Sequence, residues 1–140
     1  MFKKILIAND GSTSAKNALK VAIDLAKKYN AELHSISVEE GLPHYAATIG
    51  EVEEFKHEAN NYFRKVNEEA IEMAKKEEVE LHVKVLPGHE VETIVNYTRE
   101  GKFDLLVIGF MGHSKIFGRV WGSSSYNITK LAPCTVIVVK

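Results

Sequence analysis

The sequence predicts an α/β protein with one doubly wound, five-stranded parallel sheet in the order 3-2-1-4-5 and helices on both faces. Short apolar segments alternate along the chain with longer segments in which apolar residues recur at helical spacing. Parallel strands need crossover connections, and regular alternation of strands and helices supplies them. With 140 residues, 45% of them hydrophobic, the chain has the size and composition of a single domain, residues 1–140.

Five segments have strand character. Two of them, residues 5–8 and 105–108, are uniformly apolar, which is typical of central strands covered on both faces. Two others, residues 32–38 and 79–86, alternate between apolar and polar side chains, and Pro87-Gly88 ends the second of these. The last strand is predicted at residues 135–139, at one edge of the sheet.

Four segments have the apolar period of a helix. Between residues 39 and 50 the chain carries Gly41, Pro43 and Gly50 without a clear period, so we expect a connecting loop there. The predicted helices follow the apolar positions within residues 15–26, 52–73, 91–98 and 123–131.

Charge and cysteine content narrow the possible functions. Lys and Arg total 18 and Asp and Glu total 19, so the chain lacks the basic excess expected of a nucleic-acid or membrane-surface protein. No signal peptide is visible, and no apolar run approaches the roughly 20 residues that cross a bilayer. A single cysteine, Cys134, excludes an internal disulfide and suits a reducing compartment. We therefore expect a cytoplasmic protein with neither nucleic acid nor membrane as partner.

A series of glycines after the fourth predicted strand is the strongest functional signal. Gly109 ends that strand, Gly112 follows, and nine residues later Gly122-Ser123 opens the last helix. The free N–H groups and the dipole of a helix N-terminus favour an anion, and serine hydroxyls add donors. From residue 105 to the end there is no Asp or Glu but there are four Lys or Arg residues, which also favours an anion. This pattern predicts a phosphate site.

The predicted strand order places a second segment of the chain beside this site. Strands 1 and 4 are neighbours at the topological switch point, where ligands of such sheets bind beyond the carboxyl ends of the strands. The turn that follows strand 1, Asn9-Asp10-Gly11-Ser12, should therefore face Gly109 across one crevice.

These motifs resemble the universal stress protein family over essentially the whole chain. The matching segments are ILIANDGS, FDLLVIGFMG, the spaced glycines that end in GSSS, and APCTVIVV. The resemblance implies a five-stranded α/β fold, usually dimeric, and an ATP site built on the pattern G-x2-G-x9-G-[S/T]. One departure is Asn9, where the family often has an apolar residue.

The resemblance also implies a set of binding residues, with Mg²⁺ or Mn²⁺ accompanying the nucleotide. Asp10 would lie near the ribose or the phosphates, and Ala8 and Val38 would line the adenine pocket. The remaining residues would hold ribose and phosphates largely through backbone amides: Gly109, Met111, Gly112, Gly122, Ser123 and Ser124.

The leading interpretation is an ATP-binding regulator or sensor of stress, in which nucleotide orders residues 112–122 and 39–50 and changes the choice of an unidentified protein partner. The apolar last strand, at an unprotected sheet edge, predicts a homodimer. Two alternatives remain open at this point. One is a slow ATPase or nucleotidyl-transferring enzyme, although Asp10 is the only evident general base. The other is a nucleotide-free dimeric interaction module whose glycines are purely architectural.

Other signals are weak. The chain has no P-loop motif, no GxGxxG after the first strand and no GxSxG motif. Its six histidines show no metal-binding spacing, and His34 and His82 are interpreted as half-exposed strand residues. Cys134 is interpreted as a packed thiol rather than a nucleophile.

Overall fold

A computed structural model describes residues 1–40, 49–110 and 123–140 as a five-stranded parallel sheet flanked by helices. The strand order is β3-β2-β1-β4-β5, and every pair of neighbours is parallel. The elements in chain order are β1 (Lys4–Ala8), α1 (Thr13–Tyr29), β2 (Glu32–Glu39), α2 (Ile49–Lys76), β3 (Leu81–Pro87), α3 (Glu90–Glu100), β4 (Leu105–Gly109), α4 (Ser123–Leu131) and β5 (Thr135–Val139).

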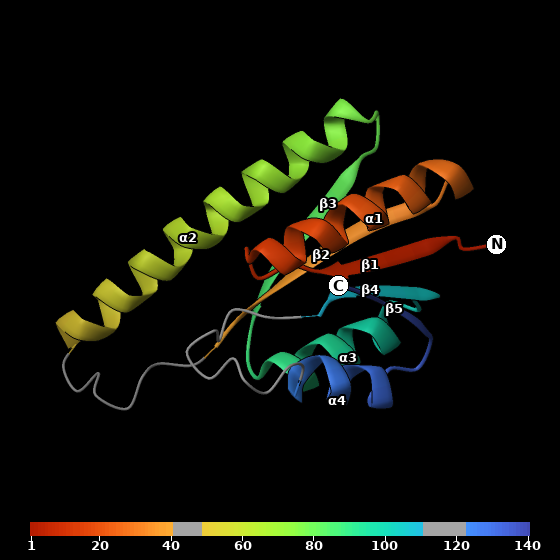
Figure 1. Ribbon diagram of the computed structural model, residues 1–140. Coiled ribbons are helices and arrows are strands. Elements are labelled where there is room, and N and C mark those ends of the chain that lie inside the picture. The colour runs from red at the N-terminus through yellow and green to blue at the C-terminus, as the bar shows by residue number, and fades with distance from the viewer. Residues whose placement is uncertain (41–48, 111–122) are drawn as a thin grey trace.

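The helices form one layer on each face of the sheet. Helices α1 and α2 lie on one face and α3 and α4 on the other, with the long α2 extending past the sheet at its amino-terminal end (Figure 1). Because all strands run the same way, the chain begins at the amino edge of the sheet and ends at the carboxyl edge (Figure 1). The predicted architecture and strand order are confirmed.

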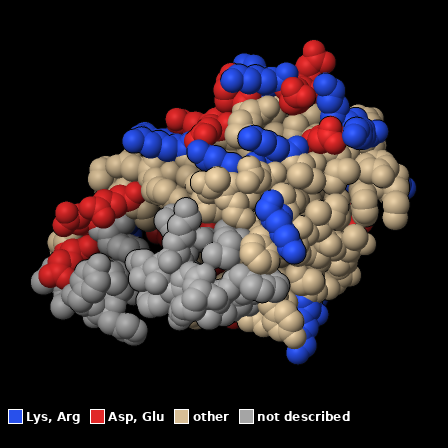
Figure 2. All heavy atoms as spheres, viewed as in Figure 1, with Lys and Arg blue, Asp and Glu red and all other residues tan. Residues whose placement is uncertain are grey.

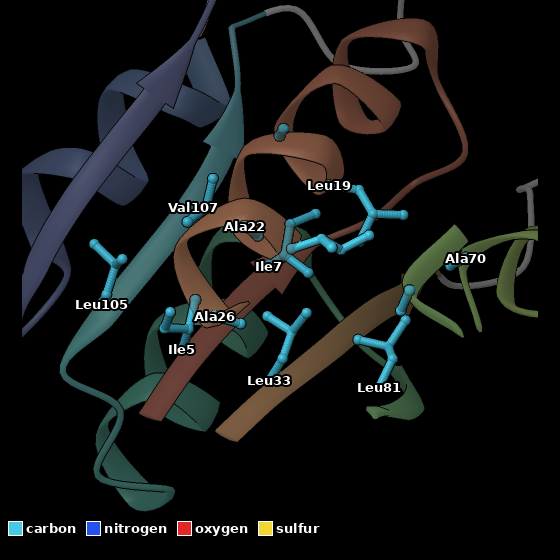
Figure 3. Packing of buried hydrophobic residues seen from close by; sticks show 13 residues of the cluster. Ile5, Ile7, Leu19, Ala22, Ala26, Leu33, Ala70, Leu81, Leu105 and Val107 are labelled. Atoms are coloured by element: carbon cyan, nitrogen blue, oxygen red, sulfur yellow. The ribbon is translucent and has the colours of Figure 1, made fainter. Parts of the chain in front are cut away.

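Alternating side chains of the central strands divide the core into two clusters. Ile5 and Ile7 of β1 pack under the small residues of α1 together with Leu105 and Val107 of β4 (Figure 3). Alanines at this helix surface let α1 approach the sheet closely. On the other face, Leu6 and its neighbours pack against α3 and α4. Both uniformly apolar segments are therefore central strands, as predicted.

The structure corrects two predicted element boundaries. Residues 39–50 were expected to form a loop, but Glu39 is the last residue of β2, and Gly50 lies in the first turn of α2. Glycine is a poor helix former, but Gly50 is an exposed residue of the first turn, and the helix continues for more than twenty residues beyond it. The third strand begins at Leu81 rather than at residue 79.

Charged side chains are mixed over the face that α1 and α2 cover, where lysine and arginine alternate with aspartate and glutamate (Figure 2). No described helix is both long enough and apolar enough to cross a membrane.

The two-sided burial of β4 allows a stability test. Leu106 is fully buried among α3 and α4, whereas Leu131 at the end of α4 is 54% exposed. We expect Leu106→Ala to lower the free energy of unfolding by about 2–5 kcal/mol through lost transfer energy and a residual cavity. Leu131→Ala should change it by less than about 0.5 kcal/mol. Urea denaturation followed by circular dichroism measures both values, and similar losses in the two variants would contradict the burial of β4.

Candidate functional site

The strand register brings the carboxyl ends of β1, β2 and β4 to one edge of the sheet. Ile7 pairs with Val107, and Ala8 pairs with Ile36. When the same register is extended beyond the paired residues, Asn9 is level with Gly109 and Asp10 is level with Val38. Neighbouring strands are about 4.8 Å apart, so the turn after β1 and the end of β4 lie side by side.

Asn9 fixes the start of the β1–α1 turn. Its backbone N–H donates to the carbonyl of Ile36 at 2.9 Å. Its Oδ1 accepts the N–H of Gly11 at 3.0 Å, and its carbonyl accepts the hydroxyl of Ser37 at 2.7 Å. These bonds satisfy a polar residue that is 4% exposed. The residue that departs from the resembled family's apolar pattern is therefore a structural anchor of the turn.

Asp10 and Ser12 complete the turn and begin α1. Oδ1 of Asp10 accepts the N–H of Ser12 at 2.9 Å, an Asx-type bond that aims this carboxylate along the turn. Oγ of Ser12 accepts the N–H of Ala15 at 3.1 Å and is the N-cap of α1. Asp10 is half-buried, so its carboxylate is held by the backbone but still reaches solvent at the carboxyl edge.

Tyr62 of α2 contacts this turn, which the sequence did not predict. Its hydroxyl donates to the carbonyl of Asp10. Burial raises the pKa of Tyr62, and the nearby Asp10 carboxylate raises it further, so the hydroxyl stays protonated as a donor. Gly11 has φ +83°, and a Cβ there would lie 2.4 Å from the Tyr62 hydroxyl and 2.7 Å from Val66. Only glycine therefore fits between the turn and α2.

The packing of α1 against the end of β4 requires glycine at position 109. A Cβ at this position would lie 2.5 Å from Oγ of Ser14 and 2.8 Å from the Ser14 backbone. The space next to Gly109 is thus filled by the first turn of α1, and the absence of a side chain there serves helix–strand packing. Ser125 joins the same strand end to α4, because its Oγ donates to the carbonyl of Gly109 at 2.8 Å.

The apolar candidates Ala8 and Val38 lie on the face of the sheet that α3 and α4 cover. Both are half-buried and pack against the cluster that contains Leu6 and Ile36. A parallel strand directs alternate residues to one face, and the register places these two on the same face of neighbouring strands. They form an apolar surface beside the turn that carries Asp10.

The remaining predicted residues are divided between described and undescribed parts of the chain. Met111, Gly112 and Gly122 lie outside the described residues, as do the glycine loop 112–122 and most of the segment 39–50. Ser123 and Ser124 are the first two residues of α4, and Ser124 is half-buried. The described part of the site therefore comprises Ala8, Asp10, Val38, Gly109 and the amino-terminal turn of α4.

Comparison with known proteins gives the same family over the full length. The model of the "Universal stress protein family" matches residues 1–140. Universal stress protein MJ0531 of Methanocaldococcus jannaschii is 33% identical over 145 aligned residues, which cover 100% of this chain and 83% of that protein.

Solved structures agree in fold. A universal stress protein UspA from Lactobacillus plantarum superposes with a TM-score of 0.87 at 24% identity, covering 99% of this chain and 98% of that chain. A universal stress protein solved in complex with cAMP has a TM-score of 0.77 at 25% identity, covering 99% of this chain and 97% of the other. On these grounds, the chain belongs to the universal stress protein family.

Proposed function

We propose that this protein binds ATP at the carboxyl edge between β1 and β4 and acts as a nucleotide-dependent regulator in the stress response. The observation that carries the proposal is the meeting of three features at that edge. These are the half-buried carboxylate of Asp10, the apolar pair Ala8 and Val38, and the amino-terminal turn of α4. A relative of the same fold is solved with cAMP, another adenine nucleotide.

Each feature suits a different part of the nucleotide. Ala8 and Val38 offer an apolar surface to the adenine, and the Asp10 carboxylate can accept hydrogen bonds from ribose hydroxyls. The first amides of α4 have no partner within their own helix and favour phosphate oxygens. The pattern Gly109, Gly112, Gly122, Ser123 supplies further backbone donors in this proposal.

A divalent cation fits the same arrangement. Mg²⁺ and Mn²⁺ prefer oxygen ligands and are commonly held by one carboxylate together with substrate phosphates. Asp10 places a carboxylate directly after β1, and its Oδ1 is already oriented by the N–H of Ser12. When bound, the cation would neutralise phosphate charge, while Asp10 and the backbone donors position the nucleotide.

The contact between Tyr62 and Asp10 gives the proposed regulation a physical connection. A ligand that displaces the turn after β1 also changes the hydrogen bond from α2 to the carbonyl of Asp10. The protein partner is then selected by the surface that α2 presents. Cys134 is a free, half-buried thiol, which suits the reducing, cytoplasmic location in this proposal.

We further propose a homodimer joined through β5. This strand is at one edge of the sheet, and its residues from Val136 to Val139 are only half-buried. An apolar edge strand carries unpaired N–H and C=O groups and pairs readily with a second chain.

Substitution of Asp10 tests nucleotide binding. Asp10→Asn keeps an oxygen that can accept the Ser12 N–H but removes the negative charge. We expect the affinity for ATP with Mg²⁺ to fall by about tenfold because a charge-assisted contact is lost. Isothermal titration calorimetry measures this, with ATP plus chelator and cAMP titrated in parallel to identify the preferred ligand.

Asp24→Asn is the matched control, because Asp24 is on the exposed side of α1 and pairs with Lys28. Its ATP affinity should equal that of the wild type. If the wild type gives no saturable heat at millimolar ATP, the nucleotide-free interaction module is favoured instead. Turnover of labelled ATP that is lost in Asp10→Asn would favour the enzyme.

Charge on the edge strand tests the dimer. Thr135→Lys places an ammonium group on an exposed position of β5 and should convert a dimer to monomers in sedimentation velocity, because the charge must be desolvated on pairing. Val85→Lys makes the same change on the opposite edge strand, β3, where Val85 is 38% exposed, and should leave the dimer intact. A monomeric wild type, or dissociation by Val85→Lys alone, would contradict pairing through β5.

A further inference from the structure

Three metal-ligating side chains meet at the amino edge of the sheet, away from the proposed nucleotide site. Glu32 and His34 are two residues apart on β2, and His82 pairs directly with His34 across the β2–β3 ladder. Residues two apart on a strand point to the same face, and paired residues of neighbouring strands share a face. The sequence spacing alone did not reveal this cluster, since it depends on the register of two strands far apart in the chain.

The geometry is that of a compact ligand set. The candidate ligand atoms of the three side chains all lie within 4.8 Å of one another. The two imidazole rings are stacked, with centroids 4.7 Å apart and an angle of 28° between the planes. His34 and His82 are strand residues, as expected, and the strand register also brings their rings together.

One ligand atom has an unmet bonding capacity. Nε2 of His34 is buried and has no hydrogen-bond partner among the described residues. It lies 3.4 Å from Oε2 of Glu32, within ion-pair distance but without the geometry of a hydrogen bond. Its contact is thus a long one to a second member of the cluster, and a ligand shared with Glu32 would satisfy this nitrogen more fully.

Phe103 contacts both His34 and the nearby Lys4. Phe103 contacts the His34 ring edge-on, with centroids 5.1 Å apart. Lys4 also lies near this cluster, but its Nζ donates to the carbonyl of Gly101 at 2.7 Å and lies over the Phe103 ring. Glu32 and His82 are exposed, so the open side of the cluster faces solvent.

We propose that Glu32, His34 and His82 form a binding site for a divalent transition-metal ion, with zinc as the best match. Two imidazoles and one carboxylate are a ligand set that zinc accepts, with bonds of about 2.0–2.2 Å and water as fourth ligand. Tetrahedral ligands at that distance are roughly 3.3–3.5 Å apart. Small side-chain rotations of the exposed Glu32 and His82 close the gap from the present separations.

Zinc titration of the nucleotide-free protein tests the site. We expect calorimetry with zinc chloride to show saturable binding by the wild type and a rise in Tm with zinc concentration, because an ion that binds only the folded state stabilises it. His82→Gln removes an exposed ligand at little risk to folding and should weaken zinc binding by about tenfold or more. Glu32→Gln should weaken it in the same direction.

His89→Asn is the matched control, because His89 is an exposed histidine at the start of α3 and its side chain makes no capping bond. It should bind zinc as the wild type does. The proposal is overturned if the wild type shows no saturable zinc binding up to millimolar concentration. It is also overturned if His82→Gln loses less than tenfold, or if His89→Asn loses as much as His82→Gln, since the ion then binds elsewhere.

Discussion

The pairing of β1 with β4 is the constraint on which the rest of the structure depends. Residues 5–7 of β1 and 105–107 of β4 are fully buried, and their register is direct. The helix after β1 packs on one face of the sheet and the helix after β4 on the other. The connections that follow β1 and β4 therefore lead to opposite faces of the sheet, which makes this pair of strands the topological switch point. Topology therefore predicts a ligand site at the carboxyl edge before any binding residue is considered.

The sequence predicted most of this framework because each central strand is a short, uniformly apolar segment. A strand that is buried on both faces needs apolar side chains throughout. The uniformly apolar residues 5–8 and 105–108 therefore predicted two interior strands of the sheet. Gly50 was misassigned because glycine is typical of loops, whereas here it lies in the exposed first turn of a long helix. The contact from Tyr62 to Asp10 could not be predicted, since it depends on where a long helix crosses the β1–α1 turn. Helical periodicity gives the buried face of α2 but not that position.

In the candidate site, residues that the family pattern assigns to binding also have structural roles. Gly109 was expected to let a ligand approach, yet its missing side chain is already required by Ser14 of α1. Ser125 likewise uses its hydroxyl to join α4 to β4. Glycines and serines in a family pattern are thus weak evidence for a ligand when taken alone. Asp10 is stronger evidence for a ligand. Among the described residues, no packing contact requires a carboxylate at this open edge.

Strand β2 contributes to both proposed sites, which lie at its opposite ends. His34 and Val38 are on the same face of β2 and four residues apart, about 13 Å along an extended strand. The strand between them is paired on both sides, with β1 and with β3, and Ile36 at its centre is buried. A doubly paired, packed strand transmits little displacement, so a ligand at one end has no evident means of changing affinity at the other. A measured dependence of ATP affinity on zinc would therefore require a path outside β2, through the helices that cover the sheet.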